Sequence, residues 1–383
     1  MSLPEIRLKV RATGRHPWFY RKMIEKPASK LPAGGPVRVV DRDRRFVGTG
    51  FYNPRTELAL RMLSRADTPD VDELLARLLT AACALREDVL GLPRVTTAYR
   101  LVHAEGDGVP GLVLDRLGDT IVGQLFSLAM QQRIERIGEQ LLSRYPKTRL
   151  ALLVDDTARE REGMDKQPPP AGHDTEIQEH GIRFLVQPGQ GHKTGFFADQ
   201  RDNRQLVRML SRGRTVLDLC CHAGGFALAA ALGGAKRVVA VDLDEAAVAA
   251  TRANAQRNGA RVEARHEDAF ATLRNLTPGA HDLLILDPPK WISGKGELET
   301  GVGRYRDFNR LAFEKAAPGT VVVTCSCSGA LSEDSFLRLL REAAAQAHRD
   351  VAVLAVRGAG PDHPVALECP ETRYLKVVVA VCR

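Results

Sequence analysis

Two short segments place acid and thiol groups directly after runs of apolar residues. Residues 287–291 read Asp-Pro-Pro-Lys-Trp after the apolar run 283–286, and residues 324–328 read Thr-Cys-Ser-Cys-Ser after the run 321–323. Short apolar runs bounded by turn residues are typical of buried parallel strands. Because ligand sites in open parallel sheets lie at the carboxyl ends of the strands, we expect Asp287 and the thiols to share one cleft, where an acid meets a nucleophile.

A third segment, upstream, predicts a ligand-binding loop. Residues 215–226 read Thr-Val-Leu-Asp-Leu-Cys-Cys-His-Ala-Gly-Gly-Phe, a pattern typical of a strand, a tight turn and the start of a helix. Its glycines let the backbone approach a ligand closely. A second apolar run, 237–241, ends at Asp242, where an acidic residue would meet ribose hydroxyls in a dinucleotide-type fold. The loop lacks the full Gly-x-Gly-x-x-Gly pattern, which disfavours NAD.

The order of these motifs resembles that of class I S-adenosylmethionine methyltransferases. The shared features are Asp-x5-Gly-Gly-Phe, a strand-end acid, the His-Glu-Asp-Ala segment 266–269 and the Asp-Pro-Pro segment. The resemblance implies S-adenosyl-L-methionine as the cofactor. It also implies the following contacts: Asp218 and Gly224 beside the methionine portion, Asp242 at the ribose, Asp268 at the adenine amino group, and Asp287 with Pro288 at the cofactor and facing the substrate.

Further segments narrow the resemblance to one family. Residues 191–204 resemble a motif of the bacterial large-subunit ribosomal RNA cytosine-5 methyltransferases that carry an N-terminal PUA domain, and residues 101–112, 304–309, 362–364 and 374–376 are similar to other segments of that family. The likeness spans nearly the whole chain. It implies 23S rRNA as the RNA partner and a homodimer. Within 191–204, it implies these further cofactor-binding residues: Lys193, Thr194, Phe197, Asp199 and Arg201.

The chemistry of this family explains why a thiol and an acid are both needed. Carbon 5 of cytosine is a weak nucleophile until a cysteine thiolate adds to carbon 6 while an acid, here Asp287, interacts with ring nitrogen 3. Alignment on residues 326–329 indicates Cys327 as the nucleophile, whereas the Thr-Cys-Ser signature of the wider group indicates Cys325; we favour Cys327. Lys290, a further catalytic candidate, occupies the place of a second cysteine that assists release in the wider group, so the sequence leaves open which residue removes the carbon 5 proton.

Three other functions fit part of the pattern. Methyltransferases that modify exocyclic amines use a similar acid-Pro-Pro motif followed by an aromatic residue, but here Lys290 holds that position and Trp291 comes one later. Methylation of a guanine ring nitrogen is known in a related branch. Both reactions would leave Cys327 without a catalytic purpose. The third alternative is a non-catalytic ribosome-assembly factor that binds RNA and keeps the cofactor fold as a scaffold.

Composition restricts the class of protein. The chain has 383 residues, 44% of them hydrophobic, which is enough for two or three domains. We find no run of eighteen apolar residues and no secretory signal, so we expect a cytoplasmic protein without membrane contact. The seven cysteines lack the Cys-x-x-Cys spacing of metal sites. We therefore predict reduced thiols and no metal, with the Cys-Cys-His segment 220–222 at a buried strand end.

Charge is distributed unevenly along the chain. Residues 1–65 contain fifteen Lys or Arg against five Asp or Glu, while the whole chain has a net charge of +8. This asymmetry is typical of a module that holds nucleic acid, attached to a catalytic domain, because neutralised phosphates release counterions. A solvated basic face without a partner is the alternative. Residues 15–22 alternate aromatic rings with cations, which suits unpaired RNA unless the rings belong to the core.

The element pattern predicts a multidomain α/β protein. We expect a small, PUA-like N-terminal β-barrel over residues 1–68, a central α+β domain over 69–178 and a Rossmann-like class I methyltransferase domain over 179–383. Local sequence also predicts one helix cap and one hairpin. Asp70 or Asp72 should cap a helix, and residues 111–115 and 120–125 should pair as a hairpin. The last two strands, 351–356 and 374–381, have no helix between them, so they should pair antiparallel.

Overall fold

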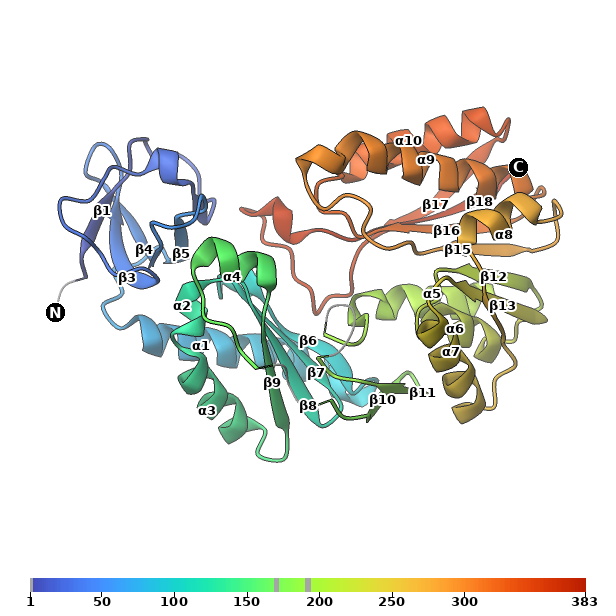
Figure 1. Cartoon of the computed structure of the whole chain (residues 1–383), viewed down its shortest axis with the longest axis horizontal. Helices are drawn as coiled ribbons and strands as arrows, with labels where there is room; N and C mark the ends of the chain where they lie inside the picture. Colours follow the sequence, from blue (N-terminus) through green and yellow to red (C-terminus); the bar gives the residue numbers. More distant parts are fainter. Residues whose placement is uncertain (1–2, 169–171, 190–193) are drawn as a thin grey trace. The chain divides into compact units, whose positions relative to one another are not determined.

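The chain forms two compact units, each built from more than one stretch of sequence (Figure 1). The computed structural model describes residues 3–168, 172–189 and 194–383. Unit 1 combines Met1–Ile177, Val186–Ala198 and Pro361–Thr372, and unit 2 combines Gln178–Leu185, Asp199–Gly360 and Arg373–Arg383. The predicted boundaries at 68 and 178 divide the chain into continuous ranges, and they stay a prediction.

Unit 1 begins with the predicted small β domain. Its five-stranded sheet has the order β1-β3-β4-β5-β2. The strands are β1 (Glu5–Arg7), β2 (Trp18–Phe19), β3 (Gly35–Val40), β4 (Phe46–Tyr52) and β5 (Leu60–Ser64). Every second side chain along a strand points to the same face, so Val37, Val39, Leu60 and Met62 enter one small apolar core. Gly48 is needed where β4 meets β5, because a Cβ there would lie 2.1 Å from the carbonyl oxygen of Ser64.

A second sheet of unit 1 packs against helices. Its order is β6-β7-β8-β9. The elements are α1 (Val71–Ala84), β6 (Ala98–His103), β7 (Leu112–Leu117), β8 (Thr120–Leu125), α2 (Leu128–Gln131), α3 (Ile134–Arg144), β9 (Arg149–Val154) and α4 (Asp156–Glu162). The predicted hairpin is confirmed as the antiparallel pair β7 and β8. Asp70 caps α1, since its side chain accepts a hydrogen bond from the Glu73 amide at 2.9 Å, and such a cap typically contributes about 1 kcal/mol.

Unit 2 is built on a seven-stranded sheet with the order β14-β13-β12-β15-β16-β18-β17. The strands are β12 (Thr215–Leu219), β13 (Arg237–Asp242), β14 (Glu263–His266), β15 (Leu283–Leu286), β16 (Val321–Ser326), β17 (Val351–Arg357) and β18 (Lys376–Cys382). A hairpin of β10 (Thr175–Glu179) and β11 (Ile182–Val186) precedes it. The central strands are buried on both faces, which explains their nearly continuous apolar sequence.

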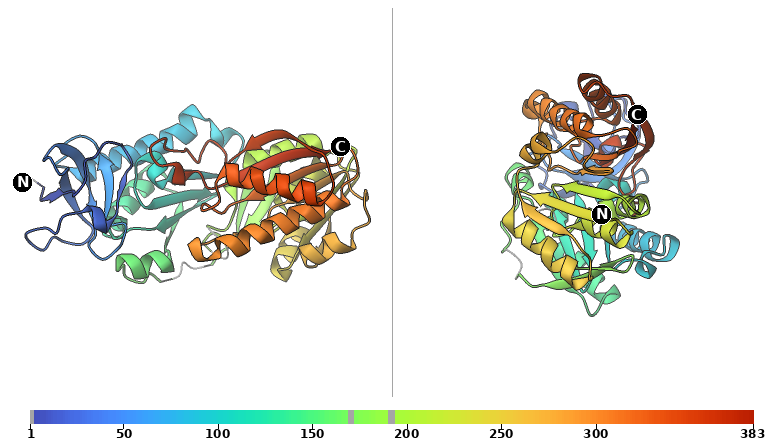
Figure 2. Two further views of the ribbon diagram at one scale, coloured as in Figure 1. Left: turned by 90° about the horizontal axis from the view of Figure 1, so that it is seen from above. Right: turned by 90° about the vertical axis from the view of Figure 1, so that its right-hand side faces the viewer.

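Helices cover both faces of this sheet (Figure 1). They are α5 (Arg201–Leu210), α6 (Gly225–Leu232), α7 (Glu245–Arg257), α8 (Ala269–Asn275), α9 (Leu298–Lys315) and α10 (Glu333–Gln346). Residues of α8, α9 and α10 form one apolar core with the sheet, and residues of α5 and α6 form another. Seen from above in Figure 2, α9 and α10 lie over the strands. This is the predicted parallel arrangement with crossover helices.

The end of the sheet confirms the predicted reversal. Strand β18 lies between β16 and β17 and is antiparallel to both. The last strand of the chain is therefore inserted into the sheet instead of being added at its edge. Among the helices of the described residues, none has the length and apolar character to span a membrane.

Candidate functional site

The two segments singled out in the sequence meet at one edge of the unit 2 sheet. Strand β15 lies between β12 and β16, and Leu286 is in register with both Leu219 and Thr324. Because all three strands are parallel, the residues that follow them emerge at the same edge. Asp287 therefore lies beside Cys325, as its position after the strand predicted.

Asp287 is partly buried and held by a side chain that the sequence did not single out. Its Oδ1 accepts a hydrogen bond from Nε2 of Gln200 at 3.1 Å. The amide of Gln200 is oriented in turn by Asn203, which donates to its oxygen at 2.7 Å. Gln200 falls inside the motif 191–204, but nothing in the sequence indicated which residue of that motif would reach the carboxylate.

The two cysteines of β16 occupy different environments. Cys325 is fully buried, and its burial and the charge of Asp287 raise the pKa of its thiol. Cys327 is only partly buried and follows Ser326, the last residue of the strand, which is paired with Lys376. A buried thiol with a raised pKa is a small core residue, whereas Cys327 is the more exposed residue of the two.

Ser328 fixes the turn that carries Cys327. Its hydroxyl accepts from the amide of Ile292 at 3.2 Å and lies 3.1 Å from the hydroxyl of Tyr305. Its carbonyl oxygen accepts from Nζ of Lys376 at 2.6 Å. The loop after β15 and the turn after β16 are thus held together by one serine.

Lys290 and Trp291, which follow the Asp-Pro-Pro segment, have different surroundings. The side chain of Lys290 is exposed, while the ring of Trp291 packs in an aromatic cluster with centroids 4.7 Å from Tyr305 and 5.4 Å from Phe308. Pro288, between Asp287 and these residues, is buried. The Trp291 ring is therefore engaged in packing.

Asp218 is a buried carboxyl group with one open acceptor. Its Oδ2 accepts from the amide of Ala227 at 2.9 Å, but its Oδ1 is buried and has no hydrogen-bond partner in the described chain. Burial, followed by the charge of Asp287, raises the pKa of Asp218 to about 8. A buried acceptor without a donor is costly, so a ligand that brings a donor or a cation to this point is favoured.

The loop after β12 brings its backbone close to the same place. Cys220, His222 and Gly224 all have positive φ angles, which expose backbone groups on the inner side of the turn. At Gly224, with φ +81°, a Cβ would lie 2.7 Å from Cδ1 of Leu228, so only glycine fits. The amide of His222 donates to Asp242 Oδ2 at 2.8 Å, which fixes the strand-end acid predicted to meet a ribose.

Asp268 follows β14 at the same edge of the sheet. Its side chain is exposed and caps α8 by accepting from the amide of Ala271 at 2.8 Å. Together with the loop after β12, these acids surround the end of the sheet with acceptors. These carboxylates can accept hydrogen bonds from a ligand that carries amine or hydroxyl groups.

The motif 191–204 is divided between the two units. Lys193 lies outside the described residues. Thr194 and Phe197 belong to unit 1, where the Thr194 hydroxyl donates to Asp115 at 2.7 Å. Asp199 and Arg201 belong to unit 2. Asp199 accepts a hydrogen bond from the Tyr374 hydroxyl at 2.6 Å, and the fully buried Arg201 donates to Asp202 at 3.1 Å.

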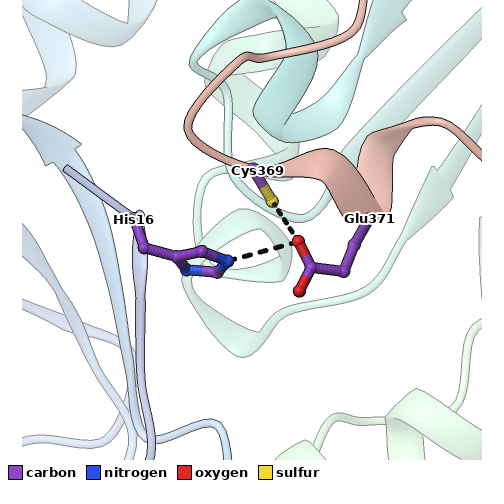
Figure 3. A group of neighbouring side chains, drawn as sticks. All are labelled: His16, Cys369 and Glu371. Atoms are coloured by element: carbon purple, nitrogen blue, oxygen red, sulfur yellow. Dashed lines mark hydrogen bonds and ion pairs between the residues drawn. The ribbon is translucent and has the colours of Figure 1, made fainter. Parts of the chain in front are cut away.

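Two groups of side chains that include cysteine were considered as metal sites. Burial raises the thiol pKa of both Cys220 and Cys221, so both are protonated near neutral pH. In unit 1, His16, Cys369 and Glu371 converge (Figure 3). Glu371 Oε2 lies 3.2 Å from His16 Nε2 and accepts from the Cys369 thiol at 3.5 Å. Burial raises the pKa of Cys369 to about 12, so this cluster satisfies itself through the carboxylate.

The aromatic residues near the N-terminus have separate roles. Phe19 belongs to the core of the β domain, and the indole N–H of Trp18 donates to Glu105 at 2.8 Å. Tyr20 remains 43% exposed. Of the three rings that the sequence offered for base stacking, Tyr20 is the most exposed.

Comparisons with known proteins agree with this architecture. Residues 8–65 match the PUA-like domain family, and residues 167–364 match the S-adenosylmethionine-dependent methyltransferase family. "Ribosomal RNA large subunit methyltransferase I" of Aeromonas salmonicida (strain A449) is 35% identical over 382 residues, which cover 96% of each chain. A solved SAM-dependent methyltransferase from Streptococcus mutans has a TM-score of 0.81 at 21% identity and covers 98% of this chain and 100% of its own. A further methyltransferase structure, complexed with S-adenosylhomocysteine, has the same TM-score and identity and covers 100% of both chains.

The fold and the strand-end site define a class I methyltransferase. The chain belongs to the family of S-adenosylmethionine-dependent methyltransferases that carry a PUA-like domain. The predicted fold class and cofactor are confirmed.

Proposed function

We propose that this protein methylates carbon 5 of a cytosine in large-subunit ribosomal RNA, with Cys327 as the nucleophile. Support for the RNA substrate comes from the name of its 35% identical relative, a ribosomal RNA large subunit methyltransferase, and from the PUA-like domain. Support for the chemistry comes from one observation in particular: Cys327, a partly exposed cysteine, directly follows β16, at the same sheet edge as the carboxylate of Asp287.

The reaction assigns a separate task to each of these groups. Cys327 adds to carbon 6 of the cytosine ring, which makes carbon 5 nucleophilic. Asp287, oriented by Gln200, interacts with ring nitrogen 3 and supplies or positions the proton needed as charge builds there. S-adenosylmethionine supplies an electrophilic methyl group when bound. A base then takes the carbon 5 proton, the bond between sulfur and carbon 6 breaks, and Cys327 leaves as a thiolate. Our candidate for the base is the exposed Lys290 in its neutral amine form, after its ammonium group has given a proton to solvent.

Burial favours Cys327 over Cys325 in this role. The Cys325 side chain has no exposed surface, and its pKa is raised by burial and by Asp287, so its thiolate is disfavoured and out of reach of a base. The aromatic packing of Trp291 argues against amine methylation, because its ring already packs against Tyr305 and Phe308 and is only partly exposed.

The cofactor contacts are part of the same proposal. The open acceptor of Asp218 suits the ammonium of the methionine portion, while Asp242 and Asp268 suit the ribose and the adenine amine. Gly224 keeps the loop close to the ligand. We also propose that the cations of residues 1–65 and the exposed ring of Tyr20 hold the RNA.

The decisive experiment compares Cys327→Ser with Cys325→Ser. Each variant is incubated with labelled S-adenosylmethionine and unmodified 23S rRNA, and the methylated nucleoside is identified by mass spectrometry. We expect 5-methylcytosine from the wild type, a loss of at least about 10³-fold in Cys327→Ser, because the covalent route is removed, and a loss of less than about 10-fold in Cys325→Ser.

Calorimetric binding of S-adenosylmethionine is the control, and it should be unchanged in Cys327→Ser. Full methyl transfer by Cys327→Ser would contradict the covalent mechanism. Recovery of a methylated guanine or an N-methylated base would show that another atom is modified. Binding of RNA without binding of the cofactor would favour the assembly-factor alternative.

A further inference from the structure

Lys376 is a buried cation that the proposed mechanism does not use. It begins β18, a strand whose other residues are apolar except for Cys382, and it is only 2% exposed. A lysine in such a strand is unusual, because burying an ammonium group costs several kcal/mol unless it is compensated. The next four residues of β18 are apolar and buried. An apolar side chain could therefore also pack at position 376, so packing alone does not require a lysine there.

The contacts of Lys376 place its ammonium group beside the turn that carries Cys327. In the sheet, Lys376 is in register with Ser326. Its Nζ donates to the carbonyl oxygen of Ser328 at 2.6 Å and to that of Tyr374 at 2.7 Å. The two carbonyls use two of the three N–H donors, and the third has no acceptor in the described part of the chain.

We propose that the Lys376 ammonium group stabilises the thiolate of Cys327 and fixes the turn that presents it, which makes Lys376 a positioning residue of the methyltransferase site. This inference rests on the proposed role of Cys327 as the nucleophile. The thiol proton leaves to solvent, the ammonium keeps its own proton, and the negative sulfur is formed next to a fixed positive charge.

Electrostatic coupling between Lys376 and Cys327 agrees with their proximity. Burial lowers the pKa of Lys376 to about 8, while the charge of Cys327 acts in the opposite direction and raises it. At pH 7 the amine is therefore still mostly protonated. An interaction energy between two titrating groups is shared by both, so the ammonium favours the thiolate by as much as the thiolate favours the ammonium.

Other charged groups around this pair are few. Lys376 also feels the charges of Arg373 and Lys290, which lower its pKa, and of Glu333, which raises it and which forms an ion pair with Arg373.

Next to Cys327, Tyr305 and Cys325 are neutral near pH 7, because burial raises the pKa of both. Asp287, whose charge reaches Cys325, acts against a thiolate. A lysine cation is what offsets that negative charge at this edge of the sheet.

The test measures the thiol itself rather than methyl transfer. In the full-length protein, the rate of alkylation of Cys327 by iodoacetamide is followed between pH 5.5 and 9, with tandem mass spectrometry to separate Cys327 from Cys325. In the wild type we expect half-maximal reactivity below the value of about 8.5 for an ordinary thiol. In Lys376→Met the profile should move up by about one pH unit, which slows alkylation about 10-fold at pH 7.

Two further variants separate charge from structure. Lys376→Arg keeps the charge and should stay within about 3-fold of the wild-type rate at pH 7. Lys315→Met removes another lysine of unit 2 that donates to a backbone carbonyl, that of Arg274, and should leave the profile unchanged. An unshifted profile in Lys376→Met, or an arginine variant that behaves like the methionine variant, would overturn the proposal.

The result stays interpretable if a variant misfolds or if the proposed function fails. If Lys376→Met does not fold, as judged by circular dichroism, the wild-type profile still decides: an inflection at or above about 8.5 overturns the inference. If Cys327→Ser retains methyl transfer while the alkylation profile shifts as expected, the nucleophile role fails and the thiolate stabilisation stands. If Cys327→Ser is inactive and the profile does not shift, the inference about Lys376 alone fails.

Discussion

Arg86 in unit 1 and Asp218 in unit 2 are both ionisable residues without exposed surface, but only Arg86 has a hydrogen-bond partner for every polar atom that it buries. The guanidinium of Arg86 donates to both carboxylate oxygens of Asp107, at 2.6 and 2.8 Å, and to three backbone carbonyls. Asp218 receives a single hydrogen bond and keeps one oxygen open. In unit 1, the buried charge of Arg86 stabilises contacts between distant parts of the chain. At the edge of the unit 2 sheet, the buried carboxyl group of Asp218 keeps an oxygen that can bind a ligand.

The neighbours of Arg86 extend the same comparison. Arg100 donates to Asp115 at 2.6 Å and contacts His103, whose pKa is lowered to about 2 by burial and by the Arg100 charge, so that the histidine is neutral. The amide of Arg100 donates to Asp362. This network ties the segment 361–372 into unit 1, which gives the Asp-His-Pro motif seen in the sequence a structural role.

The largest effect is expected when the compensated pair is broken. Arg86→Met leaves the carboxylate of Asp107 buried without its cation, and removal of one partner of a buried pair typically costs about 3–5 kcal/mol. Chemical denaturation should show this loss. Arg136→Met is the control, since the Arg136 side chain is 64% exposed and its pair with Asp72 should contribute less than about 1 kcal/mol. Equal losses of unfolding free energy in the two variants would show that the buried pair stabilises the protein no more than the exposed pair does.

A smaller effect with a characteristic pH dependence is expected at Asp218. Its folded pKa of about 8 lies above the ordinary value of 3.8, so between these values the folded state binds the extra proton and stability falls as pH rises. Asp218→Asn removes this penalty and should gain up to about 1.4 kcal/mol per pH unit relative to wild type, levelling off above about pH 8. Thermal unfolding from pH 5 to 8.5 measures it. The exposed Asp307→Asn should show no such slope, and a flat difference for Asp218→Asn would show that the carboxyl is compensated.

The smallest effect, with the opposite sign, is expected at the other edge of the same sheet. Hydrogen bonds from the amide and hydroxyl of Thr215 lower the pKa of Asp282, which is exposed. Its stabilisation is present above pH 3.8 and is lost as pH falls through the lowered pKa. Asp282→Asn should cost less than about 1 kcal/mol at pH 7 because solvent screens the interaction, and the cost should shrink as pH falls below 3.8 and through the lowered pKa. A cost that stays constant across that acid range would rule out the charge as its origin.

Parts of the site were predictable because strand order and register determine them. Once 283–286 and 321–326 are parallel neighbours, Asp287 must emerge beside Cys325, and the absence of a helix before the final strand gives its reversed direction. Asp70 was predictable as a cap because a cap depends only on local sequence.

Other parts depend on contacts between distant segments. Gln200 reaches Asp287 across 87 residues of sequence, and Ser328 joins two loops and α9. No local pattern indicates these contacts. The signal for Lys376 was present, a lone cation heading an apolar strand, but its role needed the position of the turn at Cys327. The division of 191–204 between two units likewise follows from tertiary packing.

The position of β18 has a consequence for how the protein is made. Because β18 is inserted between β16 and β17, both of those strands keep an open edge until residues 376–382 have been synthesised. Open apolar edges invite pairing with other chains. A polypeptide that stops shortly before residue 376 should therefore be prone to aggregation and proteolysis. Such a truncation would prevent stable folding of the unit 2 sheet, and not only methyl transfer.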